Sequence, residues 1–330
     1  MSRGVARQFH ISDQLSIVSI CAFRITAFIG LIGTVALLGG IVDDFQGFLF
    51  LLVNDASFLD KNFFNSSFAL LWQANIASLF WFSLAYRKVT KIDYIFLALT
   101  SMSIILRFAF VYIVIAAFYF LIPMIASRRI DLKHLLKYGV LLFIVFNYLI
   151  FSTYAFDAAD NVFAAYAVKV YPYTAGNIVA FLYHFDSFPI SLVSLSGAGQ
   201  IYEALGLSSI SSYIDDYFNF NIEIESRMIF IQQVAGQKVY GNTHTIFGQL
   251  IYLPSILYFP YLLCFGFLLK KIHLMSRKSV YFLTVHCWFS AASFLAFSGA
   301  GHFTTTRFFP AILFIFPLYL FLTIALRPKR

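Results

Sequence analysis

The pattern of apolar positions along the chain predicts a series of membrane-spanning helices. A helix needs about 20 predominantly apolar residues to cross the hydrocarbon layer of a bilayer. We expect each apolar run of roughly this length to form one crossing. Such runs occupy residues 15–41, 68–86, 135–153, 247–269, 280–298 and 308–326.

A further apolar run, from Ile92 to Ala126, is too long for one crossing and contains Arg107 near its middle. A charge in hydrocarbon is costly unless it is paired or reaches water. The run therefore predicts a hairpin of two short helices, 92–106 and 108–126, with Arg107 at the apex. The predicted fold class is all-α and polytopic, with about eight transmembrane helices.

The composition of the chain agrees with this interpretation. Hydrophobic residues make up 61% and charged residues 12% of the sequence, and the mean hydropathy of +0.82 is far above that of a soluble domain. The net charge of +8 would suggest nucleic acid as a partner of a soluble protein. Because basic residues mark the cytoplasmic side of membrane proteins, we expect membrane lipid and no nucleic acid instead.

The basic clusters set the predicted topology. With a hairpin at 92–126, both termini and the basic loops at 87–91, 128–137 and 270–278 all lie on one side of the membrane. That side holds most of the 23 Lys and Arg residues and is the cytoplasm by the positive-inside rule. The other face is then the location of the chemistry.

We expect one integral membrane domain with three parts. The predicted parts are N-terminal membrane helices (1–153), a long and mostly helical outer segment (154–246), and C-terminal membrane helices (247–330).

Three arginines on the predicted outer face are candidates for binding an anionic substrate. Arg107 could place its forked guanidinium on phosphate oxygens or could merely extend to the interface. Arg227 could serve the same purpose or pair with Glu223 or Glu225 beside it, and Arg307 could instead anchor the last helix. If two of these arginines met, they would form a pocket suited to a diphosphate.

A cluster of amide, hydroxyl and imidazole groups directly precedes an apolar run. It consists of Asn242, Thr243, His244 and Thr245. An unperturbed imidazole has a pKa near about 6.5, which suits a general base that removes a proton from a sugar hydroxyl. His302, in the turn before the last predicted helix, is the competing candidate. The alternative role of Asn and Thr in the cluster is to cap the helix that follows.

No metal or cofactor is expected. The acidic pairs Asp157/Asp160 and Asp215/Asp216 lack a recognisable ligand spacing and are interpreted as solvated surface charges. The sequence contains no phosphate-loop pattern, nucleophile elbow or zinc motif.

Three stretches together resemble a known family. They are the helix hairpin SIILRFAF, the basic loop SRRIDLKHLLK and, after a long outer segment, the polar cluster that enters a membrane helix, GNTHTIFGQLIY. In this order they are similar to the Wzy-type O-antigen or oligosaccharide repeat-unit polymerases, over roughly residues 92–320. The NTHT junction is the most specific part of the likeness.

The resemblance implies a glycosyltransferase in the bacterial inner membrane. Such enzymes polymerise undecaprenyl-diphosphate-linked repeat units into surface polysaccharide, such as the O-antigen of lipopolysaccharide, at the periplasmic face. A chain-length regulator protein is an implied partner. This placement agrees with candidate residues on the outer face and with inner loops that lack any nucleotide-binding pattern.

The mechanism expected from this resemblance divides the candidates into two groups. The catalytic candidates are a histidine base, His244 or His302, and Arg107, which would stabilise the departing diphosphate. The substrate-binding candidates are Arg227, Arg307, Asn242, Thr243 and Thr245.

Other functions remain open from the sequence. An O-antigen ligase of the same superfamily would transfer the glycan to lipid A core. A flippase or transporter for lipid-linked oligosaccharide would need a charged path, whereas the predicted helix interiors contain little charge apart from Arg24 and Arg107. A non-catalytic membrane scaffold would give the outer polar cluster no special role.

Overall fold

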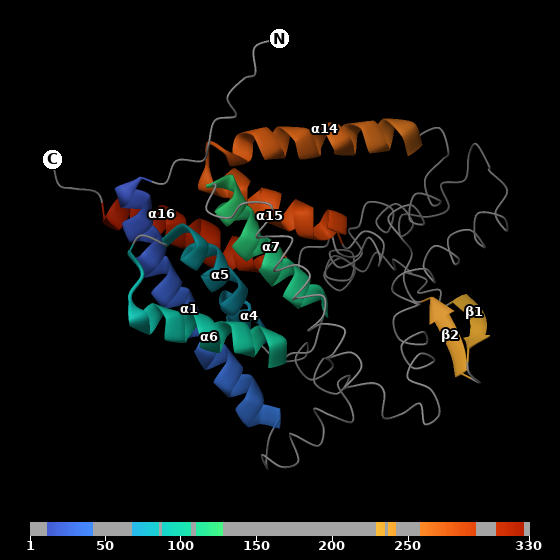
Figure 1. Ribbon diagram of the computed structural model, residues 1–330, viewed down its shortest axis with the longest axis horizontal. Helices are drawn as coiled ribbons and strands as arrows, with labels where there is room; N and C mark the ends of the chain where they lie inside the picture. The colour runs from blue at the N-terminus through green and yellow to red at the C-terminus, as the bar shows by residue number, and fades with distance from the viewer. Residues whose placement is uncertain are drawn as a thin grey trace, which may run out of the picture. The chain divides into compact units, whose positions relative to one another are not determined.

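The chain divides into two compact units. Unit 1 comprises Met1–Leu135, Leu269–Ala291 and Phe308–Arg330, and unit 2 comprises Leu136–Leu268 and Ala292–Arg307. Figure 1 shows the helices and strands. The computed structural model describes residues 12–41, 68–85, 88–106, 110–127, 229–234, 237–241, 258–294 and 308–326.

The described elements of unit 1 are helices, which confirms the predicted all-α class for this part of the chain. They are α1 (Asp13–Ile41), α4 (Phe68–Trp72), α5 (Ala74–Ala85), α6 (Lys91–Leu106), α7 (Phe110–Ala126), α15 (Val280–Phe294), the π-helix η7 (Pro310–Ile315) and α16 (Phe316–Ala325). Helix α14 (Tyr258–Ser276) precedes α15, and its residues from Leu269 onward belong to unit 1.

The predicted helix pair in the long apolar run is confirmed. Helix α6 ends at Leu106, directly before Arg107, and α7 begins at Phe110. Helix α14 differs from the prediction, which ended at 269, because it continues through Lys270 and Lys271 to Ser276. Lysine is a good helix former and is favourable near a helix C-terminus, so the end of the apolar run does not end the helix. The predicted crossing at 135–153 lies outside the described residues.

Two described helical segments are long and apolar enough to cross a membrane, judged by length and composition. They are Asp13–Gly39 and Phe68–Ala85, the second of which joins α4 and α5. Shorter apolar helices occupy Tyr112–Ala126, Val280–Phe294 and Pro310–Ala325. The described residues therefore support association with a membrane but do not establish eight crossings.

Helix α1 is antiparallel to the α4–α5 segment and parallel to α6, which both pack against it. It runs antiparallel to α4 and α5, because Gly33 meets Trp72 and Gly30 meets Asn75. It runs parallel to α6, because Arg24 pairs with Asp93 and Thr34 contacts Ser103, and both pairs are 69 positions apart. The first turns of α1 and α6 and the last turn of α5 therefore point to one end of unit 1.

Aromatic contacts, together with the ribbon in Figure 1, give the remaining directions. The ring pairs Trp72–Tyr112 and Phe80–Tyr119 make α7 parallel to α5. The pairs Trp288–Phe308 and Tyr281–Tyr319 make α15 antiparallel to the η7–α16 segment, and Trp81 stacks with Tyr319, which joins α16 to α5. Six helix ends thus share one end of unit 1: the N-termini of α1, α6 and α15 and the C-termini of α5, α7 and α16.

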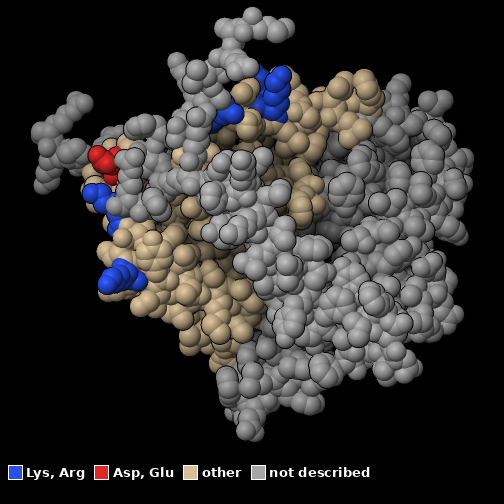
Figure 2. Space-filling model, viewed as in Figure 1, with Lys and Arg blue, Asp and Glu red and all other residues tan. Residues whose placement is uncertain are grey.

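This shared end carries most of the described cations, and we call it the basic end. It bears Arg24, Lys88, Lys91, Arg277 and Lys278. In Figure 2 the Lys and Arg side chains visible among the described residues lie along the upper and left edges, and the other described residues seen in this view are almost all uncharged. The described cations of unit 1 thus gather toward one end, while the membrane topology read from the sequence stays a prediction.

Close approach between α1 and the α4–α5 segment depends on two glycines. A Cβ atom added at Gly30 would lie 2.5 Å from the side-chain oxygen of Asn75, and one at Gly33 would lie 2.5 Å from the backbone nitrogen of Trp72. Small residues allow helix backbones to approach in this way in membrane proteins. Trp72, Phe23 and other large side chains fill the remaining space and are fully buried.

The described part of unit 2 contains a hairpin that the sequence analysis did not predict. Strand β1 (Ile229–Val234) pairs antiparallel with β2 (Gln237–Gly241), from Ile229 opposite Gly241 to Val234 opposite Gln237. The signal for it was two residues, Ala235 and Gly236, between two short runs rich in β-branched and aromatic residues.

Candidate functional site

The predicted site residues all lie outside the described residues, so their arrangement stays a prediction. This holds for Arg107, Arg227, Asn242, Thr243, His244, Thr245, His302 and Arg307. Their chain neighbours are informative in three cases. Strand β2 ends at Gly241, directly before the polar cluster that begins with Asn242.

The described residues next to Arg107 and Arg307 in the chain both lie at one end of unit 1. Leu106, the last residue of α6, directly precedes Arg107, and Phe308, before η7, directly follows Arg307. Both Leu106 and Phe308 lie away from the basic end, because α6 begins there and α16 finishes there. The helix directions thus place Leu106 and Phe308, the described neighbours of the two arginines, at the end of unit 1 opposite the basic end.

A network of uncharged polar groups lies in the core between three helices. The Asn75 Nδ2 atom on α5 is 3.0 Å from the Gly30 carbonyl oxygen on α1 and 2.9 Å from the Trp72 carbonyl oxygen. It is also 3.1 Å from Thr34 Oγ1 and from Ser103 Oγ on α6, and these two hydroxyls are 2.6 Å apart. Asn75 and Thr34 are buried, as is Ser103.

The chemistry of the donors fixes the orientation of the Asn75 amide. Carbonyl oxygens can only accept, so the two protons of Nδ2 are best directed at Gly30 and Trp72, and the hydroxyls bond to each other and to the Gly30 carbonyl. The Asn75 Oδ1 atom is buried without a hydrogen-bond donor and lies against the Cα position of Gly30. The network therefore fixes α1, α5 and α6 relative to one another.

An ion pair joins α1 to α6 at the basic end. Arg24 Nε lies 2.8 Å from Asp93 Oδ1 and Arg24 Nη2 lies 3.0 Å from Asp93 Oδ2, so the pair is bidentate. Asp93 also accepts from the Thr90 amide at 2.8 Å and from its hydroxyl at 2.7 Å, which completes the N-terminal cap of α6. The side chain of Asp93 is 1% exposed and that of Arg24 is 50% exposed, so the carboxylate is the member that depends on its partner.

Arg24 is recognisable in the sequence as a charge within an apolar helix, but neither its partner nor the polar network is. The available signal was a polar residue within an apolar run, as at Asn75 and Thr34. The partners of such residues depend on helix pairing, which a single sequence does not contain. Among the described residues, no group of three or more His, Cys, Asp or Glu side chains lies close enough to hold a metal ion.

Comparisons with known proteins give no further identification. No protein-family model matches the chain, and no curated protein and no solved structure matches it. We therefore infer the function from the residues and from the geometry of unit 1.

Proposed function

We propose that the chain is a multi-pass glycosyltransferase of the bacterial inner membrane, with about eight crossings and both termini in the cytoplasm. It polymerises undecaprenyl-diphosphate-linked oligosaccharide repeat units into surface polysaccharide of the O-antigen type. The basis is the resemblance to Wzy-type polymerases together with the separation of charge between the two ends of unit 1.

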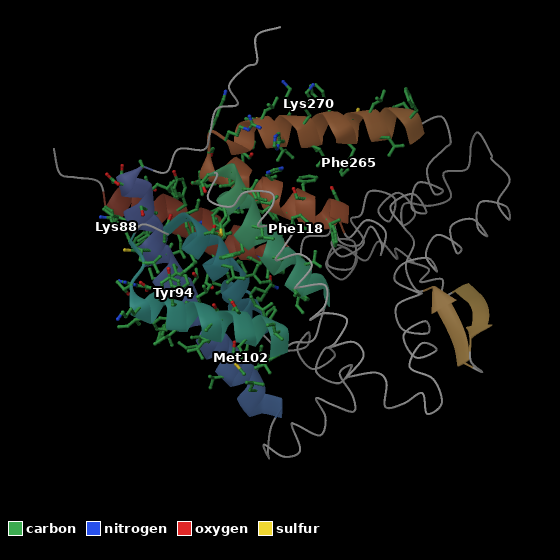
Figure 3. All side chains as sticks on the ribbon, in the orientation of Figure 1. Lys88, Tyr94, Met102, Phe118, Phe265 and Lys270 are labelled. Atoms are coloured by element: carbon green, nitrogen blue, oxygen red, sulfur yellow. The ribbon has the colours of Figure 1, made fainter. Side chains whose placement is uncertain are left out.

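Membrane insertion is supported by the surfaces of the described helices. Large apolar side chains are exposed on α6, where Tyr94 and Met102 are 53% and 58% exposed, and on α16, where Phe321 is 65% exposed. Figure 3 shows Tyr94 and Met102 along α6. A soluble protein rarely exposes contiguous apolar surfaces of this kind, whereas lipid covers them at no cost.

The observation that carries the proposal is the position of the chain on either side of Arg107. Helix α6 has 16 residues and therefore rises about 24 Å from the basic end, which is less than the roughly 30 Å of the hydrocarbon layer. An arginine attached to Leu106 then starts below the outer surface, where it must pair or reach toward water. The diphosphate of a lipid-linked glycan lies in the polar layer just above this depth, toward which a long arginine side chain extends, and it has the opposite charge.

In the proposed reaction, a hydroxyl of the acceptor glycan attacks the anomeric carbon of the donor. The bond from that carbon to the diphosphate breaks, and undecaprenyl diphosphate leaves with the electron pair. His244 or His302 takes the proton of the hydroxyl, and Arg107, with Arg227 or Arg307, stabilises the departing charge. Asn242, Thr243 and Thr245 orient the sugars through hydrogen bonds.

The described core contains little of the charge that a flippase path would need. Arg24 is neutralised by Asp93 at the basic end, and the polar network around Asn75 contains no ionisable group. A path for a diphosphate would need cations along its length, and the described residues between these two sites supply none. An O-antigen ligase shares the same outer chemistry and differs in its acceptor.

The test is conversion of purified undecaprenyl-diphosphate-linked repeat units into longer glycans in liposomes that contain the purified protein. We expect polymer from the wild type, with or without a chelator, and none from Arg107→Ala or His244→Ala. Lys88→Ala, at the basic end, is the matched control and should keep activity. Transfer of the lipid-linked unit across the bilayer without polymer would support the flippase, and transfer to lipid A core alone would support the ligase.

A further inference from the structure

A second cluster of polar side chains lies at the turn between α14 and α15. His273 and Arg277 come from the end of α14 and the turn after it, and His286 comes from α15. The Nη2 atom of Arg277 is 3.0 Å from His273 Nε2, and His273 Nδ1 is 3.3 Å from His286 Nε2. These three residues belong to unit 1, at its basic end.

The direction of these hydrogen bonds follows from the chemistry of arginine. A guanidinium can only donate, so His273 Nε2 accepts and the proton of that ring resides on Nδ1. His273 then donates to His286 Nε2, and the chain of bonds runs from Arg277 through His273 to His286. His273 thus links Arg277 to His286 on α15 and orients its guanidinium. The other N–H groups of Arg277 can donate to a further acceptor.

The surroundings of Arg277 are rich in cations. Lys270, Lys271 and Lys278 accompany it within the same stretch. Neither Lys270, Arg277 nor Lys278 pairs with a carboxylate of the described residues, and Asp93, a buried described acid, is already occupied by Arg24. Figure 3 shows Lys270 on the half of α14 that leads to α15. A group with several negative oxygens would therefore find donors here and little competition.

Apolar side chains on the same turns of α14 complete the surface. Leu274 and Met275 follow His273 in the chain and are 47% and 39% exposed. A small anion from solution gains nothing from contact with apolar side chains, whereas the acyl chains of a phospholipid can cover them. Cations at a helix C-terminus are favourable in any protein, but an oriented arginine next to exposed apolar side chains suits a lipid headgroup in particular.

We propose that the α14–α15 turn binds the phosphate of an anionic phospholipid from the leaflet at the basic end, with Arg277 as its principal donor and His273 as the residue that orients Arg277. Lys270 and Lys278 add long-range attraction. This site is independent of the polymerase chemistry, since it lies at the opposite end of unit 1 from Leu106 and Phe308, the described neighbours of Arg107 and Arg307.

Native mass spectrometry of the purified full chain in a neutral detergent, titrated with phosphatidylglycerol, tests the proposal. We expect Arg277→Gln to weaken the binding of phosphatidylglycerol by about fivefold, the typical contribution of one basic residue at a charged lipid surface. Arg277→Lys should lose several-fold as well, because lysine keeps the charge but lacks the fork that His273 orients. His273→Phe should weaken binding without removing a cation of the turn.

Lys91→Gln, at the basic end but on α6, is the matched control and should change binding by less than about twofold. Each variant is checked for unaltered size-exclusion profile and unfolding. Equal losses from Lys91→Gln and Arg277→Gln would overturn the proposal in favour of non-specific attraction. Equal binding of phosphatidylcholine, or displacement of phosphatidylglycerol by inorganic phosphate at the same concentration, would also overturn it.

Discussion

Replacing Gly33 by alanine should destabilise the protein, although alanine is the better helix former. The new Cβ atom would lie 2.5 Å from the Trp72 backbone nitrogen and 2.8 Å from the Leu71 carbonyl carbon, whereas ordinary contact begins at 3.4 Å. Backbone atoms cannot rotate away as a side chain does. The two helices must therefore separate by about 1 Å along this contact, at the expense of packing around Gly33.

The magnitude follows from two opposing terms. Overpacking of a tight interior costs about 1–3 kcal/mol, and exchanging glycine for alanine within a helix gains about 1 kcal/mol. The net loss in the free energy of unfolding should be up to about 2 kcal/mol for Gly33→Ala. Gly39, on the same helix, is the matched control, because a Cβ added there meets nothing within 4 Å. Gly39→Ala should be neutral or stabilising by up to about 1 kcal/mol.

Unfolding of each purified variant by a rising fraction of sodium dodecyl sulfate in mixed micelles measures the difference. Tryptophan fluorescence is a suitable signal, since Trp72 and Trp81 are buried in the α4–α5 segment that packs on α1. Opposite signs for Gly33→Ala and Gly39→Ala would agree with the close helix contact. A Gly33→Ala protein that is as stable as Gly39→Ala would refute the packing of α1 against α4.

The polar contacts give two further predictions in the same assay. Asn75→Asp keeps the shape of the side chain but turns an oxygen toward two carbonyl oxygens, so it should lower the free energy of unfolding by about 1–3 kcal/mol. The control Ser78→Ala, one turn later, should lower it by less than about 1 kcal/mol. Equal effects of the two variants would contradict the network. Arg24→Gln should lower the free energy of unfolding by about 1–3 kcal/mol because it leaves the buried Asp93 carboxylate without its partner. Asp93→Asn should lower it less, because Arg24 is half exposed and water can hydrate its charge. The reverse order would contradict the difference in burial between the two side chains.

The sequence predicted the helices of unit 1 well because their signal is local. A long apolar run specifies a membrane-type helix whatever its neighbours are, and a charge at Arg107 specifies the break between α6 and α7. The extension of α14 through Lys270 was missed because charge ends an apolar run without ending a helix. The β1–β2 hairpin was missed because its strands are short, and because their pairing depends on both strands together and not on the sequence of either one.

The polar pairings could not be read from one sequence. Arg24 and Asp93 are 69 positions apart, and Asn75 reaches Gly30 across 45 positions. Their contacts depend on helix direction and register, which arise when buried surfaces fit together. The outer-face candidates around His244 remain predictions of chemistry from residue type, because those residues lie outside the described part of the chain.

We propose that lipid-linked repeat units are polymerised at the face opposite the basic end. The direct measurement uses proteoliposomes in which the orientation of the protein is determined by protease access to the C-terminus, and lipid-linked repeat units are supplied to one leaflet. We expect longer glycans when the substrate faces the end of unit 1 at which Leu106 precedes Arg107, and none when it faces the basic end. Polymer formed at the basic end, or none from well-folded protein at either face, would contradict it.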